Sequence, residues 1–147
     1  MAVTGPTFAN VPGEAGRDGI TATWVFTGAG PSNGAPIGSP FAGAGAGASG
    51  LGFLAGYADK TFQVTGTFGA SPVMTIQGSN DGINWFTLTT PSGNTSGTLG
   101  VAGPATFVAA LIEQITEACV QYRPSFTGGD GTTNLTVVAF CRKTQTP

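Results

Sequence analysis

Side chains that could bind an ion or a sugar gather in one short stretch, QGSNDGINWFTL. Asn80, Asp81 and Asn84 could offer oxygen ligands to Ca²⁺, and Trp85 could stack on a sugar ring. Three ligands with a single charge make a poor calcium site, because this ion takes roughly six to eight oxygens. Asp-Gly between two β-type runs instead predicts a tight turn. We therefore expect Asp81 and Gly82 to form a structural turn, and Trp85 to lie in the core or at a subunit contact.

Residues suited to catalysis are sparse in the rest of the chain. There is no histidine, which is the commonest general base and metal ligand. No glycine-rich loop is followed by Lys and Ser or Thr, so nucleotide binding has no support. The seven carboxylates are scattered and form no fixed pair of the glycosidase type; they are Glu14, Asp18, Asp59, Asp81, Glu113, Glu117 and Asp130. We therefore predict that the chain is not an enzyme and has no catalytic site, metal site or cofactor.

The elements that must position these residues are β-strands. Alternating apolar residues and Gly-rich turns predict strands at Lys60–Phe68, Val73–Gly78, Asn84–Thr89, Ala105–Gln114, Ala118–Thr127 and Thr133–Lys143. Regularly spaced strands of this kind favour an all-β fold, an antiparallel β-sandwich or jelly roll. The segment Phe107–Ile115 would also satisfy a short amphipathic helix, and both alternatives stay open.

The two strands nearest the C-terminus predict a hairpin across the Gly-Gly-Asp-Gly turn. Joining their apolar faces would pair Val120 with Ala139 and Tyr122 with Val137, so Tyr122 is expected in the core. In this register Cys141 points inward and Cys119 points outward, so we predict two free thiols with Cys141 buried.

One further residue of this hairpin carries a prediction. Arg123 is expected to form a salt bridge with an acidic residue. Pro124 indicates a sheet edge or a bulge in the same strand, because proline cannot donate to a ladder.

Residues 1–57 differ in composition from residues 58–147. The first part contains a low-complexity Gly/Ala run with few charges, and such a backbone loses much conformational entropy on ordering. Apolar anchors interrupt it, and Ile20–Phe26 could add a strand. We expect residues 1–57 to form an extended arm that docks on a neighbouring subunit through Trp24, Phe26, Ile37, Phe41, Leu51, Phe53 and Tyr57, and residues 58–147 to form the β-sandwich domain.

The charge content points to an assembly subunit. Charged residues make up 8 % of the chain, where about 25 % is typical of soluble domains. The net charge of −2 provides no attraction for nucleic acid or for acidic membranes. Residues 1–20 lack the basic start and apolar core of a signal peptide, and no apolar run predicts a membrane helix. We expect a chain that is made in a reducing cytosol and has much of its surface covered by protein.

Three separated motifs carry a family resemblance: Gln77–Gly82 followed by Trp85 and Leu88, then Val120–Pro124, then Thr127–Thr133 followed by Leu135–Val137. In order and spacing they resemble the β-sandwich proteins of tailed-bacteriophage virions, including head decoration (cement) proteins, over about residues 60–143. The resemblance implies a non-enzymatic protein on the capsid exterior. Its implied partners are the major capsid protein and its own copies, as a trimer or dimer.

Two alternatives remain on the sequence. The chain could be another virion component, such as a head fibre, a tail subunit or a minor capsid protein. It could also be a carbohydrate- or receptor-binding module that uses Trp85 with Asn80 and Asp81. An exposed Trp85 beside a polar groove would favour this last alternative.

Overall fold

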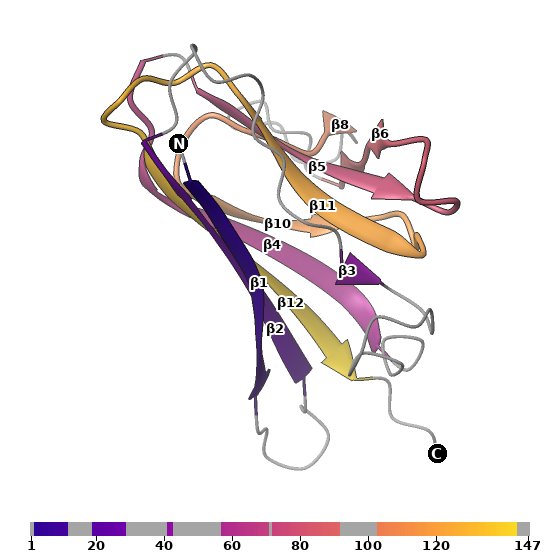
Figure 1. Cartoon of the computed structure of the whole chain (residues 1–147). Coiled ribbons are helices and arrows are strands. Elements are labelled where there is room, and N and C mark those ends of the chain that lie inside the picture. Colours follow the sequence, from indigo (N-terminus) through magenta and orange to yellow (C-terminus); the bar gives the residue numbers. More distant parts are fainter. Residues whose placement is uncertain are drawn as a thin grey trace.

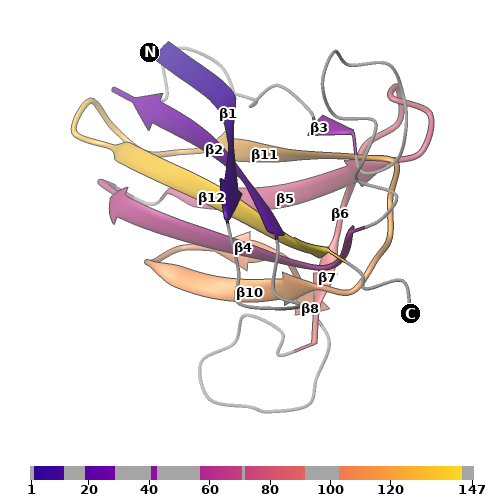
Figure 2. The same cartoon turned by 90° about the horizontal axis from the view of Figure 1, so that it is seen from below.

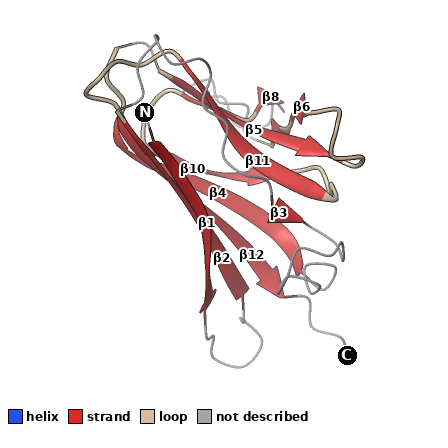
Figure 3. Ribbon diagram, viewed as in Figure 1, coloured by secondary structure: helices blue, strands red, loops and turns tan. Residues whose placement is uncertain are grey.

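The computed structural model is an antiparallel β-sandwich and confirms the predicted all-β fold (Figures 1 and 3). It describes residues 2–11, 19–28, 41–42, 57–70, 72–91 and 103–143. The strands are β1 (Ala2–Val11), β2 (Gly19–Thr27), β3 (Phe41–Ala42), β4 (Tyr57–Thr67), β5 (Val73–Ser79), β6 (Phe86–Thr87), β7 (Thr89–Thr90), β8 (Gly103–Pro104), β9 (Thr106–Phe107), β10 (Leu111–Ile115), β11 (Gln121–Thr127) and β12 (Asn134–Lys143). Among these residues there is no helix that could cross a membrane.

Two sheets pack face to face. The first sheet has the order β1-β2-β12-β4-β10, and Figure 2 shows β1 and β10 at its two margins. The second sheet has the order β3-β11-β5-β6, and β9 also pairs with β5. The small pair β7-β8 joins Thr89 to Pro104. Strands far apart in sequence therefore lie side by side, as with β2 and β12.

The inward faces of both sheets supply the core. Trp24, Phe26 and Phe62 from the first sheet are fully buried, as are Tyr122 and Phe126 from the second. The Phe26 and Phe126 rings lie 6.4 Å apart, and those of Phe62 and Tyr122 lie 6.3 Å apart. Such aromatic pairs contribute about 0.5–1.5 kcal/mol each beyond the area that they bury. The prediction that Tyr122 is a core residue is confirmed.

The predicted arm is wrong for the part of residues 1–57 that the structure describes. β2 lies inside the first sheet between β1 and β12, so the predicted strand at Ile20–Phe26 is confirmed but belongs to the sandwich. Trp24 and Phe26 are 0 % exposed and cannot dock on a neighbour. Their spacing of two places both side chains on the inward face of one strand. A domain boundary between residues 57 and 58 would also cut β4 at its first residue.

The other predicted arm residues divide into two groups. Phe41 lies in β3, which pairs with β11, and Tyr57 begins β4, so the backbone of both belongs to the sandwich. Ile37, Leu51 and Phe53 lie outside the described residues. Their predicted role in binding stays a prediction.

The predicted hairpin between the two C-terminal strands is also wrong. β11 pairs with β5 in the second sheet, whereas β12 pairs with β2 and β4 in the first. The apolar faces of β11 and β12 do meet, but across the core and not along a ladder. Asp130 stabilises the crossing, because its Oδ2 accepts a hydrogen bond from Ala70 N at 3.0 Å and its Oδ1 accepts one from Thr132 N at 2.9 Å.

Both thiols are free, as predicted. Cys141 is 2 % exposed and Cys119 is half-buried. Burial raises the pKa of the Cys141 thiol to about 11, so this side chain stays protonated and behaves as a small apolar group.

The ambiguous segment Phe107–Ile115 is neither a helix nor one continuous strand. β9 ends at Phe107, residues 108–110 bend, and β10 begins at Leu111. β9 pairs with β5 and β10 pairs with β4, so the bend carries the chain from one sheet to the other. In β11, Pro124 lies beyond the two residues that β3 pairs in the described structure, which agrees with the predicted sheet edge.

Candidate interaction site

The loop between β5 and β6 is held by one carboxylate. Asp81 Oδ1 accepts hydrogen bonds from the backbone N–H groups of Ile83 and Asn84, both at 2.8 Å, and from Ser79 Oγ at 2.9 Å. Ser79 Oγ in turn accepts the Gly82 N–H at 2.8 Å. Gly82 has a φ of +75°, the left-handed conformation that glycine adopts at little cost. The predicted turn at Asp81 and Gly82 is confirmed.

These contacts also decide what the carboxylate can bind. Asp81 Oδ2 accepts a further hydrogen bond from Asn84 Nδ2 at 2.7 Å, so both oxygens already face donors. The Asn84 and Ile83 backbone N–H groups, followed by the Asn84 and Ser79 side chains, hold the pKa of Asp81 well below its usual range. The described residues contain no cluster of three His, Cys, Asp or Glu that could hold a metal ion. The loop is therefore a rigid structural turn.

Trp85 follows this turn and lies on the outer side of the second sheet, not in the core. Its side chain is half-buried, and its indole Nε1–H donates to Gly82 O at 3.3 Å. The Arg123 guanidinium lies 4.0 Å from the ring centroid, in a cation–π contact. Of the two predicted places for Trp85, the core is wrong, because Trp24 fills that position. A subunit contact of Trp85 stays a prediction.

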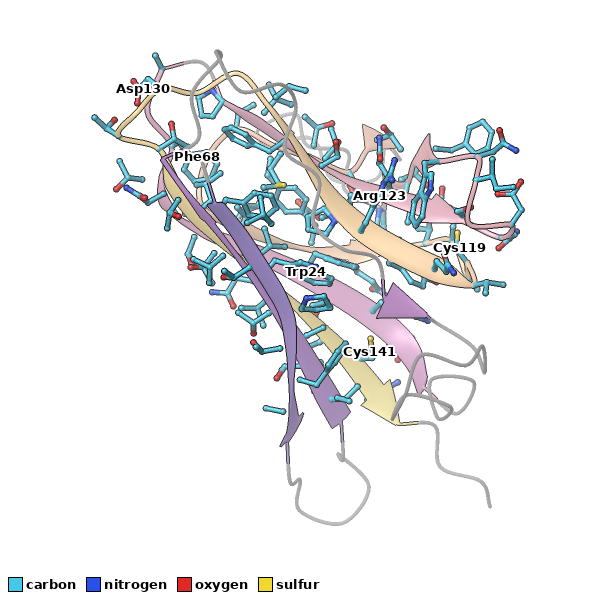
Figure 4. All side chains as sticks on the ribbon, viewed as in Figure 1. Trp24, Phe68, Cys119, Arg123, Asp130 and Cys141 are labelled. Atoms are coloured by element: carbon cyan, nitrogen blue, oxygen red, sulfur yellow. The ribbon has the colours of Figure 1, made fainter. Side chains whose placement is uncertain are left out.

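Arg123, which Figure 4 labels beside β11, is held by two contacts. Its Nε–H donates to Gln77 Oε1 at 2.9 Å across the β11–β5 ladder, and its guanidinium covers Trp85. Partial burial lowers the pKa of Arg123 without removing its charge. The predicted salt bridge of Arg123 is not found among the described residues, where Asp59 pairs with Arg142. Glu14 and Asp18 lie outside the described residues, so a salt bridge to either of them stays a prediction.

Two exposed apolar side chains lie close to Trp85 in the sequence. Ile83 is 80 % exposed and Phe86 is 69 % exposed, the highest values among the large apolar residues that the structure describes. We use the name Trp85 platform for Gln77, Trp85 and Arg123, the three residues that the two contacts of Arg123 join. The sequence indicated Trp85 as a candidate binding residue and Arg123 as a salt-bridge partner, but it indicated no role for Ile83 or Phe86. Arg123 reaches Trp85 because β11 pairs with β5 so that Arg123 lies opposite Gln77. The sequence does not indicate which strands pair, so it could not predict this contact.

A second exposed apolar group lies at the β10 edge. Val108 is 60 % exposed, Ile112 is 59 % exposed and Leu111 is 38 % exposed. β10 is the last strand of the first sheet, so one side of its backbone has no strand partner in the described part of the chain. Unprotected apolar edges of this kind are sites for strand addition.

The buried polar groups around Tyr122 have structural partners. Tyr122 OH donates to Glu117 O at 3.2 Å and accepts the Cys119 N–H at 2.5 Å. Burial raises its pKa to about 12. Lys60 Nζ lies 5.2 Å from the Tyr122 ring centroid. These contacts explain why polar residues occupy the interior, and they leave the candidate binding groups on the surface.

Comparison with family models, curated proteins and solved structures found no match to this chain.

Proposed function

We propose that this chain is a non-enzymatic structural subunit that binds major capsid subunits and its own copies on the exterior of a phage head. The observation that carries the proposal is the combination of low charge and exposed apolar side chains. The chain has 12 charged residues in 147, yet Ile83, Phe86, Val108 and Ile112 are each more than half exposed. Exposed apolar groups on a surface with so little charge favour protein contacts.

The two edges of the first sheet differ in a way that supports self-association. β1 contains Pro6 and a register shift between Thr4 and Thr7, features that discourage edge pairing. β10 has neither feature and presents Leu111 and Ile112. A copy of the same edge is a complementary occupant, since two antiparallel β10 strands would join the sheets of two subunits.

The β-sandwich provides a rigid scaffold for binding to the capsid. Several weak contacts on each copy add up when an oligomer binds a repeating capsid surface, which raises the overall avidity. The motif order at residues 60–143 supports the phage assignment through its resemblance to virion proteins. A sugar-binding role has less support, because Arg123 lies over the Trp85 ring where a sugar would stack.

Binding to capsids tests the proposal. Capsids assembled without this chain, from the phage that encodes it, are mixed with the purified protein, sedimented and imaged by electron microscopy. We expect stoichiometric co-sedimentation and added density on the outer capsid surface. Density at the tail or on a fibre would assign another virion role, and absence of the chain from all particles would overturn the proposal.

A matched pair of variants tests self-association separately. Ile112 and Gln114 lie on the same face of β10, and both are exposed. We expect Ile112→Ser to shift the protein to smaller species in analytical ultracentrifugation, whereas Gln114→Ser keeps the wild-type distribution. A wild-type protein that stays monomeric at high concentration would contradict pairing through β10.

A further inference from the structure

We infer that the Trp85 platform binds a carboxylate side chain that lies next to an apolar side chain on a partner protein. The proposal concerns the chemistry of the partner segment and extends the proposed function. Its test does not depend on a capsid, so the two can fail separately.

Arg123 has unused hydrogen-bonding capacity. Its Nε–H donates to Gln77, but its two terminal NH₂ groups have no partner among the residues that the structure describes. These groups provide four N–H donors in a planar fork that matches the two oxygens of a carboxylate. A half-buried guanidinium with free donors gains more from such a partner than a fully hydrated one does.

No carboxylate of the described structure neutralises the Arg123 guanidinium. Asp81 belongs to the same loop, but its oxygens are engaged by N–H and O–H donors of Ser79, Ile83 and Asn84. The ion pair between Arg142 and Asp59 lies in the first sheet and does not involve Arg123. The positive charge of Arg123 is therefore available to an acidic group from outside.

The side chains of the Trp85 platform are fixed in position. Trp85 is held by its hydrogen bond to Gly82 O, and Arg123 is held between Trp85 and Gln77. The Asp81 hydrogen bonds fix the intervening turn. A preorganised site loses less conformational entropy on binding, and Trp and Arg are the residues most enriched in interface hot spots.

The exposed apolar side chains near Trp85 determine which kind of residue adjoins the carboxylate on the partner. Ile83 and Phe86 lie close to Trp85 in the sequence and are exposed, so they would bury apolar surface against an apolar residue of the partner. A phosphate polymer is excluded as the occupant, because one cation on a chain of net charge −2 cannot neutralise several phosphates. The combination fits a protein segment in which Asp or Glu adjoins Leu, Ile or Phe.

A pair of peptides tests the inference directly. The ¹⁵N-labelled protein is titrated with acetyl-Leu-Glu-Leu-amide and with acetyl-Leu-Gln-Leu-amide, and the indole N–H signals are followed by NMR. We expect the Trp85 signal to shift saturably with the Glu peptide in the millimolar range, and the Gln peptide to bind about tenfold more weakly. The Trp24 indole is fully buried and serves as the internal reference.

Variants of the two arginines provide the control. Arg123→Gln should remove the preference for Glu over Gln, whereas Arg142→Gln, which alters a distant surface pair, should preserve it. An unchanged Trp24 signal shows that each variant is folded. Equal shifts with both peptides, or no shift of Trp85 with either, would overturn the inference even if Arg123→Gln fails to fold, because both results come from the wild type.

Discussion

The two tryptophans have exchanged the roles that their sequence contexts predict. Trp24 lies in a segment with the composition of an arm but is fully buried, and Trp85 lies in the hairpin but stays half-buried. Both follow alternating apolar residues, so the local pattern cannot separate them. The difference arises from the Asp81 hydrogen bonds, which hold residues 83 and 84 in the turn. The pairing of β6 with β5 therefore begins at Phe86, and Trp85 lies outside the ladder.

At the same scale, Asp81 should make stability depend on pH. The pKa of Asp81 is lowered in the folded protein. Its contribution to the free energy of unfolding is therefore fully present above the pKa of the unfolded chain, about 4, and is lost as the pH falls through the pKa of the folded protein. Asp81→Asn should therefore destabilise the protein at neutral pH, and the difference from wild type should shrink in acid. Urea unfolding at several pH values measures this, and a difference that is independent of pH would contradict it.

At the scale of elements, the sequence predicts where most strands lie but not which strands pair. The predicted strands at Lys60–Phe68 and Val73–Gly78 agree closely with β4 and β5. The pairing of β11 with β12 was wrong, because alternation tells which face of a strand is buried and not what lies beside it. The buried faces of β11 and β12 could belong to neighbouring strands of one sheet or to two sheets that face each other across the core. In the structure they belong to the two facing sheets.

Gly66 shows how tightly β4 and β12 approach each other. Its φ is +120°, and a Cβ there would overlap the Asn134 carbonyl oxygen. Gly66→Ala should destabilise the fold by about 1–3 kcal/mol, because either the strand or its partner must shift. Gly131→Ala is the matched control, since no atom lies within 4 Å of its Cβ position. Equal effects of both substitutions on the free energy of unfolding would argue against this packing.

At the scale of the whole molecule, composition was misleading about the N-terminal part. Its high glycine content and low charge are typical of linkers, so β1 was not predicted and β2 was assigned to an arm. The decisive information is the pairing of β2 with β12, a contact between distant parts of the chain. No local pattern encodes such a contact.

A truncation should reveal this integration. Removal of residues 1–57 deletes β2 with Trp24 and Phe26 and should abolish cooperative unfolding, because large core side chains each contribute about 3–5 kcal/mol. Removal of residues 1–11 deletes only the edge strand β1 and should leave a cooperative but less stable fold. Thermal unfolding followed by circular dichroism distinguishes the two, and a cooperative transition in the longer truncation would contradict the assignment.

The central position of β12 has a consequence for synthesis. It is the last described strand, yet it lies between β2 and β4, and the bond from Gly28 N to Asn134 Oδ1 joins residues 106 positions apart. A growing polypeptide on the ribosome cannot complete the first sheet until β12 has emerged. Such non-local topology makes folding slow, and the first sheet forms only after all twelve described strands have been translated. Incomplete products therefore lack the finished sheet, and only chains that contain β12 can supply subunits for an assembly.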